Sequence, residues 1–269
     1  MVATDKLFAG SIPEIYDRLL VPLIFERYAQ DLAVRIETTE PKELLETAAG
    51  TGALTSAIAF RLPAQSRIVA SDLNQPMLDR AATRPALAGR VTWRLADALA
   101  LPFEDRTFDI VACQFGVMFF PDRVKGYKEA RRVLRPRGRF IFNVWDDIRN
   151  NEFADTVTEA VATFLPHDPP AFLARTPHGY HNVGKIREDL TAAGFQKISI
   201  ETIDHVSKAA SSLEPAVAFC QGTPLRNEIE VRGASIGAAT EAAVAALAKR
   251  FGKGPIEGRI RAHIIVATA

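Results

Sequence analysis

Three carboxylates and two glycines stand where they could hold a nucleotide-like ligand. Gly50 and Gly52 follow the apolar run that carries Glu46, and a helical pattern begins directly after them. Glycines in such a turn let the backbone approach a ligand closely and leave free amides at the start of a helix. Asp72 and Asp97 each follow a later apolar segment. The spacing predicts a ligand whose hydroxyl and amino groups donate hydrogen bonds to carboxylates.

The order of these residues indicates what each carboxylate binds. Asp72 lies 20 residues after Gly52, which in a doubly wound sheet is the position that accepts hydrogen bonds from ribose hydroxyls. Asp97 is expected to end the third strand, where its carboxylate could meet an adenine amino group. Such sheets bind ligands at the carboxyl ends of their strands. The sequence therefore predicts one adenosine-like ligand at that edge.

The elements that must position these residues alternate along the chain. Strands are expected at 43–48, 66–73, 90–97, 108–115, 139–145, 196–206 and 259–269. Helices are expected at 12–36 (interrupted by Pro22), 53–61, 75–83, 122–134, 183–195 and 237–251. Alternating strands and helices predict an α/β fold, a doubly wound and mostly parallel sheet with helices on both faces.

Composition narrows the class of protein. The 33 Lys and Arg residues nearly cancel the 32 Asp and Glu residues, which argues against a nucleic-acid partner. The basic run at 131–139 is interpreted as a helix end before a strand. Cys113 and Cys220 are far apart, so neither a disulfide framework nor a zinc site is expected. The sequence contains no run of 18 or more apolar residues, so stable membrane insertion is not expected. We expect a cytoplasmic protein.

Four stretches together resemble a known family. They are LLETAAGTGALT (44–55), VASDLNQPML (69–78), RLADALALPFEDRTFDIVACQFGVMFF (94–120) and EARRVLRPRGRFIFNVW (129–145). This set is similar to the class I S-adenosylmethionine-dependent methyltransferases, in particular the branch that methylates quinones and small molecules. The resemblance implies a seven-stranded Rossmann-like sheet with helical cap insertions. It also implies S-adenosyl-L-methionine as cofactor and S-adenosyl-L-homocysteine as product.

The resemblance also implies a role for each site residue. Glu46 and the backbone of the turn at Ala48, Gly50, Thr51 and Gly52 would hold the methionine end of the cofactor. Asp72 would bind the ribose, with Leu73 and Met77 beside the adenosine. Asp97 and the Ala98 amide would read the adenine edge, and the Gln114 carbonyl would accept from the ammonium. Tyr16 would belong to an N-terminal lid over the cofactor.

Two features bear on the alternatives. A carboxylate at Glu46 suits a cofactor that has an ammonium and a sulfonium but no phosphate, and it would be unfavourable beside a pyrophosphate. An NAD(P)-dependent oxidoreductase would need G-x-G-x-x-G, and Thr55 stands at its last glycine. Ala48 stands where the family commonly has glycine. Alanine is tolerated at this position if its φ is negative. A cofactor-binding module without activity on the same fold also stays open.

The expected domain organisation follows from the same comparison. One methyltransferase domain is expected over 1–269, with a lid at 1–36, a cofactor core at 42–145 and caps at 146–182 and 207–250. The caps would enclose a small-molecule or lipid-like acceptor. No catalytic base is identified; His178, Tyr180 and His181 are candidates for a general base or for substrate contact, and no metal site is expected. Whether the chain forms a homodimer stays open.

Overall fold

The computed structural model describes residue 5 and residues 7–269, in two compact units. The first unit comprises the described residues up to Phe25 together with Trp145–Gly179 and Asp204–Arg261. The second comprises Glu26–Val144, Tyr180–Ile203 and Ala262–Ala269. Two long strands, β6 (Lys197–Ala209) and β7 (Ile256–Thr268), pass from one unit into the other.

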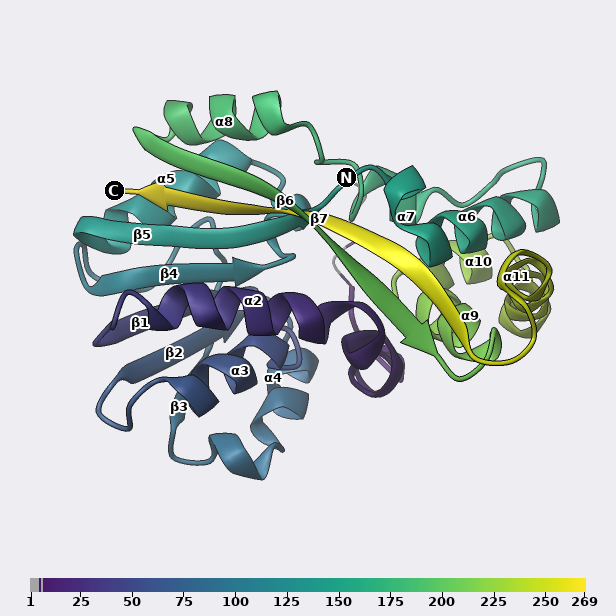
Figure 1. Ribbon diagram of the computed structural model, residues 1–269, viewed down its shortest axis with the longest axis horizontal. Coiled ribbons are helices and arrows are strands. Elements are labelled where there is room, and N and C mark those ends of the chain that lie inside the picture. The colour runs from purple at the N-terminus through teal and green to yellow at the C-terminus, as the bar shows by residue number, and fades with distance from the viewer. Residues whose placement is uncertain (1–4, 6) are drawn as a thin grey trace. The chain divides into compact units, whose positions relative to one another are not determined.

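A seven-stranded sheet is the framework of the cofactor core. Its other strands are β1 (Glu43–Thr47), β2 (Arg67–Asp72), β3 (Val91–Leu95), β4 (Phe108–Gln114) and β5 (Leu134–Trp145). The strand order is β3-β2-β1-β4-β5-β7-β6 (Figure 1). The pairs β1–β2, β1–β4, β2–β3 and β4–β5 are parallel. The predicted doubly wound, mostly parallel sheet is confirmed.

The central strands β1 and β4 are buried on both faces. Leu44, Leu45 and Val111 are fully buried on neighbouring strands, as continuous apolar runs in a parallel sheet require. Strand β3 lies at the edge, and its side chains are only partly covered or exposed. The residues that follow β1 and β4 therefore leave the most rigid part of the sheet.

Helices of the second unit surround this sheet. They are α2 (Glu26–Glu37), α3 (Ala53–Arg61), α4 (Gln75–Ala82), α5 (Arg123–Val133), α8 (Val183–Ala192) and the single turns η3 (Pro85–Leu87) and η4 (Val117–Phe119). Helix α2 packs against α3, and α5 packs against α8. After α8 the backbone reverses at Gly194, whose φ is +96°, as predicted for a helix C-cap.

The first unit is mainly helical. Its helices are α1 (Ile12–Ile15), η2 (Tyr16–Phe25), η5 (Ile148–Asn150), α6 (Glu152–Phe164), α7 (Phe172–Arg175), α9 (Leu213–Gln221), α10 (Leu225–Val231) and α11 (Ile236–Phe251). Helix α11 packs against α6 and α9. The interruption predicted at Pro22 takes the form of a ten-residue π-helix, η2. Since proline has no N–H to donate, the wider turn carries the chain past it.

Strands β6 and β7 are each three residues longer at one end than predicted, and the boundaries of β3 and β5 also differ. Strand β3 ends at Leu95, so Asp97 lies in the following loop and does not end the strand. Strand β5 begins at Leu134, five residues early, because its first residues already pair with β4. The register then shifts between Phe108 and Ile110 of β4, which absorbs the Pro136–Gly138 turn.

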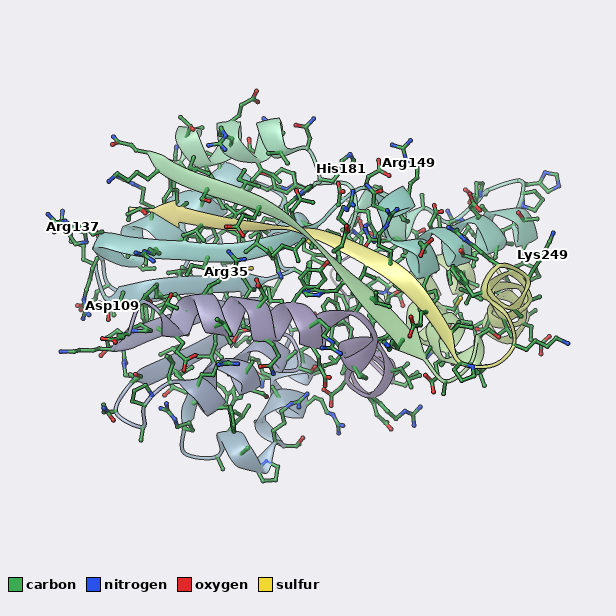
Figure 2. The ribbon with its side chains drawn as sticks, in the orientation of Figure 1. Arg35, Asp109, Arg137, Arg149, His181 and Lys249 are labelled. Atoms are coloured by element: carbon green, nitrogen blue, oxygen red, sulfur yellow. The ribbon has the colours of Figure 1, made fainter. Side chains whose placement is uncertain are left out.

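The basic run 131–139 lies where β4 and β5 begin, at the edge opposite to the carboxyl ends of these strands. Helix α5 ends at Val133 and β5 follows at once, as predicted. Arg132 pairs with Asp105, and Arg135 pairs with Asp109, each at 2.7 Å. Figure 2 places Asp109 and Arg137 together at this edge. Two arginines of this run therefore form ion pairs with neighbouring carboxylates.

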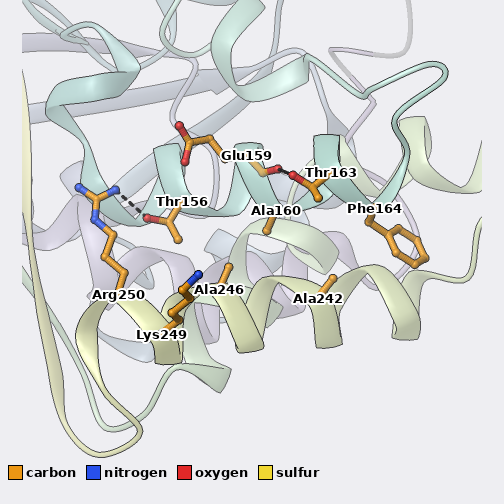
Figure 3. A pocket seen from close by; sticks show the side chains of 9 residues that line it. All are labelled: Thr156, Glu159, Ala160, Thr163, Phe164, Ala242, Ala246, Lys249 and Arg250. Carbon is orange, nitrogen blue, oxygen red and sulfur yellow. Dashed lines mark hydrogen bonds between the residues drawn. The ribbon is translucent and has the colours of Figure 1, made fainter.

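A groove lies between α6 and α11 in the first unit (Figure 3). Its volume is about 550 Å³, and Ala160, Ala242 and Ala246 form its floor. Arg250 at its rim donates to Thr156 over 3.0 Å. None of the predicted site residues lines this groove. Within the described part of the chain, no helix is both long and apolar enough to cross a membrane.

Candidate functional site

The strand register brings the predicted carboxylates to one edge of the sheet. Glu46 lies beside Ala70 of β2 and Ala112 of β4. Asp72 ends β2, and Gln114 ends β4. Because these three strands are adjacent and parallel, their carboxyl ends meet at the same edge. The structure therefore brings Glu46, Asp72 and Gln114 to neighbouring strand ends, as the sequence predicted.

The turn after β1 holds three left-handed residues at alternate positions. The φ angles of Ala48, Gly50 and Gly52 are +51°, +57° and +81°. The expectation of a negative φ at Ala48 is therefore wrong, and its backbone costs about 1–2 kcal/mol relative to a right-handed one. A Cβ on Gly52 would lie 3.3 Å from the Ala81 Cβ and 3.4 Å from the Trp93 ring. The turn needs its glycines for conformation and, at Gly52, for close packing.

Asp72 organises this turn. One carboxylate oxygen accepts the Gly50 N–H at 2.8 Å, and the other accepts the Asn74 N–H at 2.8 Å. The side chain is buried, and burial raises the pKa of Asp72 while these hydrogen bonds act against the rise. The Asn74 Nδ2 also donates to Oδ1, at 3.3 Å. The contact with ribose hydroxyls stays a prediction.

Glu46 is a carboxyl group buried inside the site. Its side chain is 1% exposed, and its Oε2 accepts the Thr55 hydroxyl at 2.6 Å. Burial raises the pKa of Glu46 to about 8, and the nearby Asp72 charge adds to the rise. A neighbouring cation would reverse much of that rise, because it stabilises the carboxylate. The position suits a positively charged ligand group.

The residues expected near the adenosine differ in exposure. Met77 is buried, with its Cε 3.6 Å from where a Cβ on Gly50 would lie. Leu73 is 49% exposed, so it is a surface side chain and no part of the core. Asp97 is exposed and accepts the Leu99 N–H at 2.9 Å, while Ala98 beside it is partly exposed. Their contact with adenine stays a prediction.

Sequence reasoning missed two residues, Phe115 directly after β4 and Asn143 on the neighbouring strand β5. Phe115 directly follows Gln114, and its φ is +49°. Its N–H donates to the Asn143 Oδ1 at 2.9 Å. Asn143 pairs in register with Gln114 and is fully buried. The available signal was a single polar residue in the otherwise apolar run FIFNVW.

Thr51 adds an unpaired polar atom to the glycine turn. Its hydroxyl oxygen is buried and has no hydrogen-bond partner among the described residues. Its carbonyl accepts the Arg84 Nε at 3.0 Å, which ties the turn to the end of α4. The turn is therefore fixed through its backbone, and one of its hydroxyls is left for a ligand or water.

Tyr16 lies in η2 of the first unit. Its ring stacks on Phe25 with centroids 5.1 Å apart and meets the edge of Phe8 at 6.0 Å. These contacts account for a packing role. Its place in a lid over the cofactor stays a prediction.

The cluster 177–181 is divided between the units. His178 is buried in the first, and its Nδ1 lies 2.8 Å from the Asp146 carbonyl, which can only accept. That nitrogen therefore carries the proton. Tyr180 belongs to the second unit and donates to Asp189 at 2.8 Å. Burial raises the pKa of Tyr180, so it keeps its proton and is a poor base.

His181 is partly exposed (Figure 2). Among the described residues, no group of three or more His, Cys, Asp or Glu side chains is arranged to hold a metal ion.

Comparisons with known proteins agree with this geometry. Residues 45–142 match the family model described as a methyltransferase domain. The chain is 33% identical over 144 residues to the ubiquinone/menaquinone biosynthesis C-methyltransferase UbiE of Geobacter sulfurreducens, covering 52% of this chain and 56% of that protein. It is 39% identical over 132 residues to the demethylmenaquinone methyltransferase of Thermus thermophilus, covering 48% and 58%. The chain thus spans little more than half the length of these relatives.

The fold is shared with solved structures as well. A SAM-dependent methyltransferase from Thermotoga maritima superposes with a TM-score of 0.55, covering 97% of both chains at 16% identity. At that identity the likeness establishes the fold alone. Residues 45–142 are therefore a methyltransferase domain. The chain has the fold of the S-adenosylmethionine-dependent methyltransferases that its sequence resembles.

The residues present suit the cofactor of this class. S-adenosylmethionine carries a sulfonium, an ammonium and a carboxylate and has no phosphate. Glu46 and Asp72 are buried carboxyl groups with raised pKa values, so both gain from an approaching cation. The α3 N-terminus has no side-chain cap, which leaves its amides for an anionic group. The positive groups of the methionine end are thus complemented by the buried carboxyl groups, and its carboxylate by the amides at the start of α3.

Proposed function

We propose that this protein transfers the methyl group of S-adenosylmethionine to a carbon atom of a quinone-like small molecule. The observation that carries the proposal is the match of its cofactor core to a ubiquinone/menaquinone C-methyltransferase at 33% identity and to a demethylmenaquinone methyltransferase at 39%. The buried Glu46 supports a cofactor without phosphate groups. An apolar, lipid-like acceptor agrees with both relatives' names.

The cofactor supplies a methyl group that is already activated by its sulfonium. The chain's own task is alignment and exclusion of water. Glu46 and the Gln114 carbonyl would hold the ammonium, and the amides of the glycine turn would hold the carboxylate. Asp72 would accept from the ribose hydroxyls, and Asp97 would accept from the adenine amino group. Met77 and Leu73 would pack beside the adenosine.

The residue at the third glycine position weighs against an NAD(P)-dependent oxidoreductase. Thr55 donates its hydroxyl to Glu46, so this position carries a side chain that serves the carboxyl group. A pyrophosphate would lie close to that carboxyl group, and its negative charge would oppose ionisation. The arrangement supports a cationic ligand end.

The proposed activity is tested with purified protein and radiolabelled S-adenosylmethionine. Demethylmenaquinone in detergent is the acceptor, and a matched quinone whose ring carbon is already methylated is the control. Label extracted with the first quinone alone supports C-methylation. Calorimetry with S-adenosylhomocysteine and with NAD runs in parallel. Binding of S-adenosylhomocysteine without transfer supports a non-catalytic module, and heat only with NAD refutes the proposal.

A further inference from the structure

One peptide group at the end of β4 is held by a side chain of β5. It joins Gln114 to Phe115, and its N–H donates to the Asn143 Oδ1 at 2.9 Å. A trans peptide is planar, so its N–H and C=O point in opposite directions. By holding the Phe115 N–H, Asn143 also fixes the direction of the Gln114 carbonyl.

Asn143 performs this task at a cost in stability. It is fully buried, and its Nδ2 has no hydrogen-bond partner within the described part of the chain. The side chain cannot be turned around, because the Phe115 N–H requires the oxygen as acceptor. A buried unpaired donor is unfavourable, because it has lost its hydrogen bonds to water. An apolar side chain would avoid this cost, so the residue serves more than packing.

The backbone after β4 is strained at the same place. Phe115 has a φ of +49°, which is unfavourable for a residue with a Cβ. Its ring meets the edge of the Tyr28 ring with centroids 5.4 Å apart. A Cβ on Gly116 would lie only 2.4 Å from the Ala48 Cβ. Strained residues persist where their surroundings fix them, and they gather at functional sites.

We propose that Asn143 is a positioning residue for the amino-acid end of the cofactor. It aims the Gln114 carbonyl and, by accepting from the same peptide group, makes that carbonyl a stronger acceptor. This inference rests on the proposed cofactor site, in which the Gln114 carbonyl accepts from the ammonium. Asn143 touches neither the cofactor nor the reacting atoms in this role.

Two ligands separate positioning from general stability. S-adenosylhomocysteine carries the amino-acid end, and 5′-methylthioadenosine lacks it but keeps the adenosine and the thioether. In the full-length Asn143→Ala variant, the dissociation constant for S-adenosylhomocysteine should rise roughly tenfold. That for 5′-methylthioadenosine should stay within about twofold. Titration calorimetry measures both.

A matched control removes a buried hydrogen bond from the same cluster. The Tyr28 hydroxyl donates to the Ile203 carbonyl at 3.0 Å, and Tyr28→Phe removes this bond while keeping the ring against Phe115. This variant should lose stability in urea unfolding but keep the wild-type ratio of the two dissociation constants. Asn143→Leu, which keeps the branched shape of the side chain with bulkier ends, serves as the second test variant should Asn143→Ala unfold.

The outcomes separate the inference from its premise. An equal loss for both ligands, or no loss for either, overturns the positioning role. If the wild-type protein binds both ligands equally well, the proposed Gln114 contact with the ammonium is refuted, and the positioning role of Asn143 with it. Cofactor binding itself would still be supported. A wild-type protein that binds neither ligand overturns the proposed function as well.

Discussion

The buried carboxyl group of Glu46 makes a pH-dependent prediction. Its pKa is raised from 4.5 to about 8 in the folded protein. Between these values the folded state keeps a proton that the unfolded state has lost. The free energy of unfolding should therefore fall as pH rises, by about 1.4 kcal/mol per pH unit. Over the whole window the loss is at most about 5 kcal/mol.

The variant Glu46→Gln removes this titration and keeps the group's size. Its amide oxygen still accepts from Thr55, so the main change is the lost proton equilibrium. Urea unfolding at pH 5.5, 7 and 8.5 should show the variant gaining stability over wild type as pH rises. Glu129→Gln is a control of opposite sign. Arg132 lowers the pKa of Glu129, so this variant should lose stability at neutral pH.

Ligand binding gives a second reading of the same group. An ammonium beside Glu46 favours the carboxylate, so S-adenosylhomocysteine should release a proton on binding below about pH 8. Calorimetry in buffers of different ionisation heat measures that proton, and 5′-methylthioadenosine should release none. Stability curves of wild type and Glu46→Gln that run parallel from pH 5.5 to 8.5 would refute the reasoning.

Three further substitutions have defined outcomes. Asp72→Ala should weaken the binding of S-adenosylhomocysteine by roughly 1–3 kcal/mol, as measured by calorimetry. An unchanged affinity would mean that Asp72 does not contact the ligand. Gly116→Ala should unfold at a lower urea concentration, because its Cβ would lie 2.4 Å from that of Ala48. Adding Ala48→Gly to the same chain should recover part of the lost stability. Equal urea midpoints for the wild type and Gly116→Ala would contradict this packing. Tyr180→Phe should cost about 1 kcal/mol by losing its bond to Asp189, while kcat stays unchanged; a large fall in kcat would instead give Tyr180 a catalytic role.

The sheet and its glycine turn could be predicted because their signals are local. Apolar runs, turn residues and helix starts alternate in the sequence, and each lies within a few residues of the element it defines. The acidic strand ends Glu46 and Asp72 belong to that pattern. Their position at one edge follows from parallel pairing alone.

The strained residues could not be predicted in the same way. Ala48 and Phe115 adopt left-handed backbones because distant partners hold them, Gly116 by packing and Asn143 by a hydrogen bond. No short-range pattern encodes such pairs. The early start of β5 is likewise decided by its pairing with β4. The sequence therefore predicts where the ligand binds better than what fixes the backbone there.

The strand order has a consequence for how the protein is made. In the sheet, β7 lies between β5 and β6, yet it is the last of the described strands to leave the ribosome. Until it arrives, β5 and β6 each present an unpaired edge, and such edges invite pairing with other chains. A stop codon before Ile256 would leave both edges permanently open. The synthesis of β7 thus covers two strand edges at once, in addition to closing the sheet.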